Sequence, residues 1–139
     1  MTYIPDRLRQ EVIERANHQC EYCLLHELDS IYSHEVDHII PEKHRGETVS
    51  SNLCFACLEC NRNKGSDFGS FDPENNEIVL LYNPRKDVWS KHFRLDDAKI
   101  IPQTATGRVT EFILKLNTEK RLSHRRLLIK AKRYPSTNE

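Results

Sequence analysis

Apolar residues recur at helical spacing near both ends of the chain. After Pro5-Asp6, three of them fall on one helical face and predict a helix that ends at Asn17-His18: Leu8, Val12 and Ala16. In the second half, the spacing i, i+3, i+4 and i+7 predicts another helix with Thr106 as its N-cap: Val109, Phe112, Ile113 and Leu116.

Runs of branched and aromatic residues predict short strands between these helices. The first covers residues 35–40 and stops at Pro41, and another covers residues 77–82. Residues 92–95 and 98–101 are predicted to pair through the turn at Asp96-Asp97. A polar loop is expected at 42–51, a short helix at 57–64 with Gly65 at its C-cap, and a polar breaker at 66–76.

This order of elements predicts an α+β fold in one folding unit. The 139 residues suffice for one ordinary domain, and a chain with 37% hydrophobic and 30% charged residues has little apolar surface to bury. We expect residues 1–70 to form a core and residues 71–139 to form a β/α extension packed on the same domain. A chain of this kind benefits from a covalent or metal crosslink.

Neither a secretory signal nor a membrane span is evident. The segment MTYIPDRLRQ lacks an apolar core, and the longest apolar run, Ile78 to Tyr82, is too short to cross a bilayer. The expected location is therefore cytoplasmic, where thiols stay reduced. Under those conditions five cysteines, four of them in Cys-x-x-Cys spacing, favour metal binding over disulfides.

The formal net charge of zero hides an uneven distribution. Residues 1–60 carry 5 Lys and Arg against 11 Asp and Glu, whereas residues 61–139 carry 16 against 10. A final helix, predicted from Asn117 or Thr118 to about Tyr134, holds most of the basic residues at the C-terminus. This helix is either a solvated basic face or an arm that contacts phosphates, and the sequence favours neither reading.

Two Cys-x-x-Cys pairs lie more than thirty residues apart. Cys20 with Cys23 and Cys57 with Cys60 can each supply two thiolates from one turn, and four thiolates complete a structural zinc site. Such a site would join the N-terminal helix to the second pair and contribute folding free energy. The alternative is reduced thiols without a metal. Cys54 does not match the paired spacing, so we expect a small core residue there rather than a fifth ligand.

Asp37-His38 lies within the first predicted strand, between the two cysteine pairs. Neighbouring strand residues point to opposite faces, so each residue is expected to have its own task. A carboxylate is a hard oxygen ligand suited to Mg²⁺ or Mn²⁺, and a neutral imidazole can take a proton from water. Asn61 directly follows Cys60, so zinc binding would also position its amide oxygen.

These motifs together resemble the HNH endonuclease family of ββα-metal (His-Me finger) nucleases, in particular its zinc-stapled branch. The resemblance rests on CEYC at 20–23, VDHIIP at 36–41, NL at 52–53 and CLECNRNKG at 57–65. The segment from Asn83-Pro84-Arg85 to Leu116-Asn117 also resembles an extension of small stand-alone bacterial, often cyanobacterial, members.

The resemblance implies metal-dependent hydrolysis of DNA phosphodiester bonds. His38 would be the general base, Asp37 and Asn61 would hold one Mg²⁺ or Mn²⁺ ion, and Asn52 would brace the loop that orients His38. The products would carry a 5′ phosphate and a 3′ hydroxyl. The family's final histidine is replaced here by Asn61, whose neutral oxygen favours hard ions.

DNA is the expected partner, bound by a monomer or a homodimer. Residues that could neutralise its phosphates lie beside the motifs and on the basic helix: Arg45, Arg62, Lys64, Arg125 and Arg126. The main alternative is a zinc-stapled DNA-binding module without catalysis, and a zinc-held structural adaptor is weaker. Because a pure binder needs no set of Asp37, His38, Asn52 and Asn61, the sequence favours the nuclease.

Overall fold

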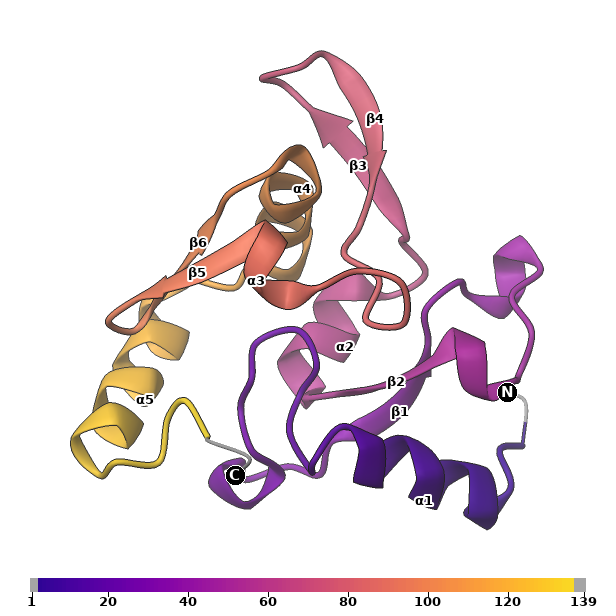
Figure 1. Cartoon of the computed structure of the whole chain (residues 1–139), viewed down its shortest axis with the longest axis horizontal. Helices are drawn as coiled ribbons and strands as arrows, with labels where there is room; N and C mark the ends of the chain where they lie inside the picture. Colours follow the sequence, from indigo (N-terminus) through magenta and orange to yellow (C-terminus); the bar gives the residue numbers. More distant parts are fainter. Residues whose placement is uncertain (1–2, 137–139) are drawn as a thin grey trace.

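The computed structural model describes residues 3–136, which form helices and three two-stranded antiparallel sheets (Figure 1). The predicted α+β class is confirmed. No helix in this range has both the length and the apolar character needed to cross a lipid bilayer.

The first half contains one sheet between two helices. α1 (Asp6–Arg15) is followed by β1 (Glu35–His38), β2 (Leu53–Ala56) and α2 (Leu58–Lys64). β1 and β2 pair so that Asp37 lies opposite Cys54 and His38 opposite Leu53. Every residue of β2 is buried. Leu53 and Phe55 pack with Val12 of α1 in one cluster, whereas Cys54 and Ala56 belong to the other core cluster.

The connections in this half are short turns of 3₁₀ helix, at Glu27–Asp29, Glu42–His44 and Ser50–Asn52. The predicted helix at 57–64 is confirmed. Cys57 is its N-cap, its sulfur accepting from the Cys60 amide, and Gly65 ends it with a φ of 52°. Glycine adopts a positive φ with less strain than any other residue.

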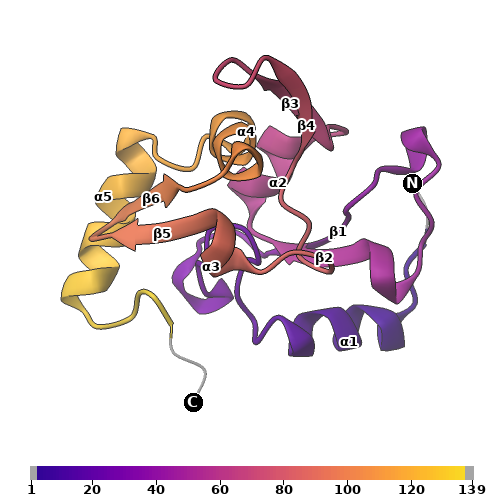
Figure 2. The ribbon, with the colours of Figure 1, turned by 45° about the horizontal axis from the view of Figure 1, so that its top comes forward.

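The second half adds two hairpins and three helices. Its elements are β3 (Gly69–Asp72), β4 (Glu77–Leu80), α3 (Trp89–His92), β5 (Phe93–Asp96), β6 (Lys99–Pro102), α4 (Ala105–Leu114) and α5 (Glu119–Lys130). The β3–β4 hairpin projects from the body, and α4 packs between this hairpin, α2 and β6 (Figure 2).

Buried residues of both halves form one main core cluster. It combines Cys20, Tyr22 and Cys60 from the first half with Tyr82, Phe93, Leu114 and others from the second. Polar contacts cross the same boundary: the Trp89 indole donates to the Tyr22 carbonyl at 2.9 Å, and the Asn63 amide donates to the Leu114 carbonyl at 2.8 Å.

Several sequence predictions are wrong in their boundaries. The strands predicted at 35–40 and 77–82 end earlier, at His38 and Leu80. The polar breaker at 66–76 contains β3, because Gly69–Asp72 pairs with β4. Thr104, not Thr106, caps α4, its hydroxyl accepting from the Gly107 amide. The last helix ends at Lys130 rather than near Tyr134.

The earlier start of α4 follows from Gly107. A Cβ at this position would lie 2.3 Å from the His92 carbonyl oxygen, so only glycine allows the first turn to approach α3 so closely.

Candidate active site and metal centre

Four cysteines from two distant turns meet in the core. The sulfur atoms of Cys20, Cys23, Cys57 and Cys60 all lie within 4.8 Å of one another, and each residue is at most 2% exposed. None of the five cysteines forms a disulfide. Zinc–thiolate bonds of about 2.3 Å in a tetrahedron place sulfurs about 3.8 Å apart; the Cys23 and Cys57 sulfurs are 3.6 Å apart. The cluster could therefore hold a structural zinc ion.

The two turns present their sulfurs in the same way. The Cys20 sulfur accepts from the Cys23 amide at 3.4 Å, and the Cys57 sulfur accepts from the Cys60 amide at 3.4 Å. Hydrogen bonds from amides favour the thiolate form that a metal requires. The equal Cys-x-x-Cys spacing thus produces two equivalent half-sites.

Cys54 lies outside this group, as expected. It is fully buried on β2, and its thiol contacts the Tyr22 hydroxyl at 3.5 Å. Burial raises the pKa of Cys54 to about 12, so the thiol stays protonated near neutral pH.

Asp37 faces α2 from the end of β1. Its side chain is 21% exposed, yet its Oδ2 atom is buried and has no hydrogen-bond partner. The nearest cation is the Lys64 ammonium, 3.6 Å from Oδ2. Burial raises the pKa of Asp37, and the charge of Lys64 opposes this rise. A buried carboxylate oxygen without a donor is suited to a metal ligand.

The His38 side chain contacts the loop that follows β1. Its Nε2 atom lies 2.8 Å from the Thr48 hydroxyl, on the loop between β1 and β2. The two neighbouring residues therefore serve different surroundings, as strand geometry requires.

Asn52 holds the loop that carries Thr48. Its amide oxygen accepts from the Ile40 amide at 2.9 Å, while its Nδ2 donates to the carbonyls of Ile40 at 3.0 Å and Glu47 at 2.9 Å. Gly46 permits this closure because a Cβ there would lie 1.6 Å from the Ile40 carbonyl oxygen. The loop is thus closed on itself at the end of β1.

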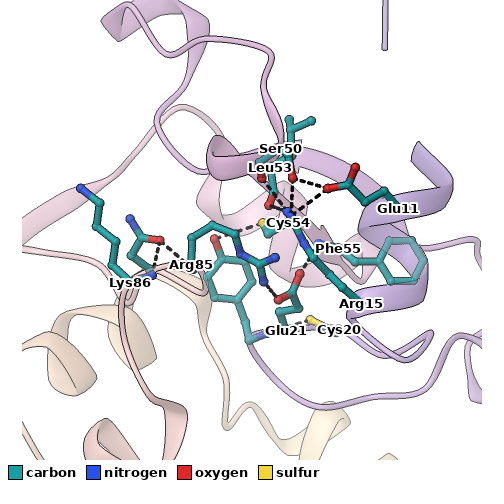
Figure 3. Close-up of polar contacts among 12 residues, drawn as sticks. Glu11, Arg15, Cys20, Glu21, Ser50, Leu53, Cys54, Phe55, Arg85 and Lys86 are labelled. Atoms are coloured by element: carbon teal, nitrogen blue, oxygen red, sulfur yellow. Dashed lines mark hydrogen bonds and ion pairs between the residues drawn. The ribbon is translucent and has the colours of Figure 1, made fainter. Parts of the chain in front are cut away.

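A second set of polar contacts holds the two ends of β2 (Figure 3). The Arg15 guanidinium donates to the carbonyls of Ser50 at 2.7 Å and Leu53 at 2.6 Å. Farther along, the Glu21 carboxylate accepts from the Phe55 amide at 3.0 Å and pairs with Arg85. These contacts connect α1 and the second half of the chain to the strand beside the candidate site.

The short helix α2 belongs to both sites. Cys57 and Cys60 define its first turn, and Asn61 follows directly. Lys64 lies one turn later on the same side of the helix. Its ammonium donates to the His38 carbonyl at 3.0 Å. Asn61 is half-buried on this side of the helix. The sequence thus places an amide oxygen on the helix face that meets β1.

The residues predicted to contact phosphates fall into two groups. Arg45, Arg62 and Arg126 are exposed. Lys64 is 1% and Arg125 3% exposed, and the Arg125 guanidinium is bonded to the Ala98 and Leu116 carbonyls and the Asn117 amide oxygen. The prediction that Lys64 and Arg125 contact DNA phosphates does not fit these positions, because both charges are enclosed by the chain's own acceptors.

Two residues at these sites were not predicted. Thr48 gives no sequence signal, since a threonine in a polar loop is common. Arg121 is 5% exposed and contacts the cysteine cluster. The sequence offers one signal for a buried Arg121. It shares a helical face with Arg125 and Leu128, and a face that packs through Leu128 would be expected to carry apolar residues at 121 and 125 as well.

A family model described as HNH endonuclease matches residues 20–67. This range contains all four clustered cysteines together with Asp37, His38, Asn52 and Asn61. No match was found among curated proteins or among solved structures.

Proposed function

We propose that this chain, which carries an HNH endonuclease domain over residues 20–67, is a metal-dependent nuclease that hydrolyses phosphodiester bonds of DNA. The observation that supports it most is the arrangement at the end of β1. There the His38 imidazole is bonded to Thr48 on one side, and a buried Asp37 oxygen without a donor faces α2 on the other. The four cysteines hold zinc in a structural role.

His38 acts as the general base. Nε2 lies 2.8 Å from the Thr48 hydroxyl. In the tautomer that carries its proton on Nε2 and donates to this hydroxyl, the imidazole keeps a lone pair on Nδ1 that takes a proton from the attacking water. The water oxygen forms a bond to phosphorus, and the bond between phosphorus and the 3′ oxygen breaks. The departing 3′ oxygen takes a proton from solvent water, so the products are a 5′ phosphate and a 3′ hydroxyl.

Asp37 and Asn61 are the ligands of the divalent ion. Their carboxylate and amide oxygens, from β1 and α2, suit hard ions such as Mg²⁺ or Mn²⁺. When bound, such an ion supplies positive charge for the scissile phosphate and the departing oxygen. Asn52 keeps the loop closed, so that Thr48 holds the imidazole in one orientation.

The exposed arginines Arg45, Arg62 and Arg126 bind the phosphates that flank the scissile bond. The acidic first half of the chain repels a polyanion unless a cation intervenes, so both the divalent ion and these side chains contribute to binding.

The decisive test is nicking of supercoiled plasmid DNA with Mg²⁺ or Mn²⁺. His38→Ala should lower the rate by about 10²- to 10⁴-fold, the usual contribution of a general base, with an unchanged melting curve. His18→Ala is the control, since this exposed imidazole pairs with Glu27 and has no task in the mechanism. Nicking by His38→Ala at the wild-type rate would refute the mechanism.

The second candidate is a zinc-stapled DNA-binding module without catalysis. It is favoured by the ion pair between Asp37 and Lys64, which gives the carboxylate a counter-charge without any metal. That function predicts salt-sensitive DNA binding and no cleavage under any divalent ion.

A further inference from the structure

The C-terminal helix α5 buries two of its arginines and exposes its other cations. Arg121 is 5% and Arg125 3% exposed, whereas Lys120, Arg126 and Lys130 are exposed. A buried guanidinium is costly unless acceptors surround it. The acceptors of the two arginines are therefore informative.

Arg121 is bonded on both of its terminal nitrogens. Nη2 lies 3.0 Å from the Cys60 sulfur and 3.8 Å from the Cys57 sulfur, and Nη1 donates to the carbonyls of Leu114 at 2.9 Å and Lys115 at 3.3 Å. The end of α4 thus holds the guanidinium in the orientation that reaches the two cysteines of α2.

Arg125 provides an internal comparison, one helical turn later. It makes a similar number of hydrogen bonds, but all of its acceptors are oxygens: the Ala98 and Leu116 carbonyls and the Asn117 side chain. Both arginines fasten α5 to the body, but of the two only Arg121 is hydrogen-bonded to the cysteine cluster.

The charge of a loaded cluster explains why an arginine is useful there. Four thiolates and one Zn²⁺ leave a formal charge of −2 in a site whose cysteines are 0–2% exposed. Arginine is always protonated, so it halves this charge and donates to ligand sulfurs. Partners of this kind, which contact the ligands rather than the metal, commonly change metal affinity by about 10- to 100-fold.

We propose that Arg121 is the counter-ion of the four-cysteine metal site, and that metal binding and docking of α5 are thereby coupled. The helix that follows α4 then completes a centre whose ligands all come from residues 20–60. Tyr134, beyond the end of α5, strengthens this closure, because its hydroxyl donates to the Cys23 carbonyl at 2.7 Å.

Coupling of this kind works in both directions. If a docked α5 tightens metal binding, a bound metal tightens docking of α5 by the same factor. This proposal concerns the metal site alone and does not depend on whether the protein cleaves DNA.

The first experiment measures zinc release from the full chain to a chelating dye, at a temperature where every variant is folded. Arg121→Met should release zinc about 10- to 100-fold faster than wild type. Arg121→Lys, which keeps the charge, should fall between them. Arg125→Met is the matched control, since it removes an equally buried guanidinium without a thiolate contact, and it should stay within about twofold of wild type. Equal release by the Met variants at 121 and 125 would overturn the proposal.

The second experiment uses the wild-type chain, so it remains decisive even if Arg121→Met does not fold. Amide hydrogen exchange is followed with zinc bound and after zinc is removed by a chelator. Residues 119–130 should lose protection together with residues 57–64, while the β3–β4 hairpin changes less. Full protection of residues 119–130 after the cysteine turns have lost theirs would show that the helix docks independently of the metal.

Discussion

The two sites that share α2 differ in how the chain closes them. In the cysteine cluster each of the four cysteines is at most 2% exposed. Arg121, on α5, contacts the Cys60 sulfur. At the end of β1, by contrast, Asp37 is 21% exposed and retains a carboxylate oxygen with no donor. Structural metal sites are closed and catalytic ones keep an open position. The difference fits the proposed roles, a structural one for the first site and a substrate-accessible one for the second.

The shared helix explains why the closed site matters to the open one. α2 has only seven residues, and a helix of that length is not stable alone. Cys57 and Cys60 fix its first turn, so Asn61 and Lys64 are positioned relative to β1 only as long as the cysteine cluster holds.

The largest expected effect comes from breaking the closed site. Cys57→Ser removes one thiolate, and the chain should lose its zinc and most of its stability, so that its melting temperature falls steeply. Structural zinc contributes about 10–16 kcal/mol of apparent binding free energy, comparable to the whole stability of about 5–15 kcal/mol of a small domain. Thermal melting and zinc content of the purified variant measure this.

Cys54→Ser is the matched control, because Cys54 is equally buried but lies outside the cluster. It should keep its zinc and lose only about 1–3 kcal/mol from burying a hydroxyl. If the serine variants at 57 and 54 melt alike and both retain zinc, the cysteine cluster is not a structural metal site.

A smaller effect should follow from loosening the open site. Thr48→Val keeps the side-chain shape but removes the hydroxyl that contacts Nε2 of His38. Loss of one hydrogen bond of about 1–1.5 kcal/mol should slow plasmid nicking about 10-fold, with an unchanged melting curve. Thr48→Ser restores the hydroxyl and should restore the rate. If Thr48→Val nicks plasmid DNA as fast as Thr48→Ser, the Thr48 hydroxyl does not orient His38 and the prediction is wrong.

The smallest effect concerns the exposed cations that are proposed to bind DNA. Arg62→Ala and Arg126→Ala should each reduce the slope of log affinity for duplex DNA against log salt by about 0.9, the value for one phosphate contact. Arg7→Ala, an exposed arginine on α1, should leave the slope unchanged. Fluorescence anisotropy across a salt series measures it, and equal slopes for all three variants would place the DNA elsewhere.

Local patterns predicted the parts of the fold that depend on local chemistry. The period of Leu8, Val12 and Ala16 predicted α1, and Gly65 marked the end of α2. β3 was missed because Gly69–Asp72 is short and polar, and it forms a strand only through pairing with β4. Thr104 was missed as the N-cap of α4 because the spacing of Val109, Phe112, Ile113 and Leu116 marks the helix face but not its first residue.

The sequence by itself predicted the cysteine cluster and the resemblance to HNH endonucleases over residues 20–67, because Cys-x-x-Cys spacing needs only one turn to aim two sulfurs and because Asp37-His38 lies between two such pairs. Only the tertiary structure decided which basic residues face solvent. Arg121 and Arg125 have the spacing of a phosphate-binding face, yet both are enclosed. Arg121 is bonded to the Leu114 carbonyl and the cysteine sulfurs, and Arg125 to the Ala98 and Leu116 carbonyls and the Asn117 side chain. Acceptors that are distant in the sequence turn two arginines of a basic helix into internal contacts.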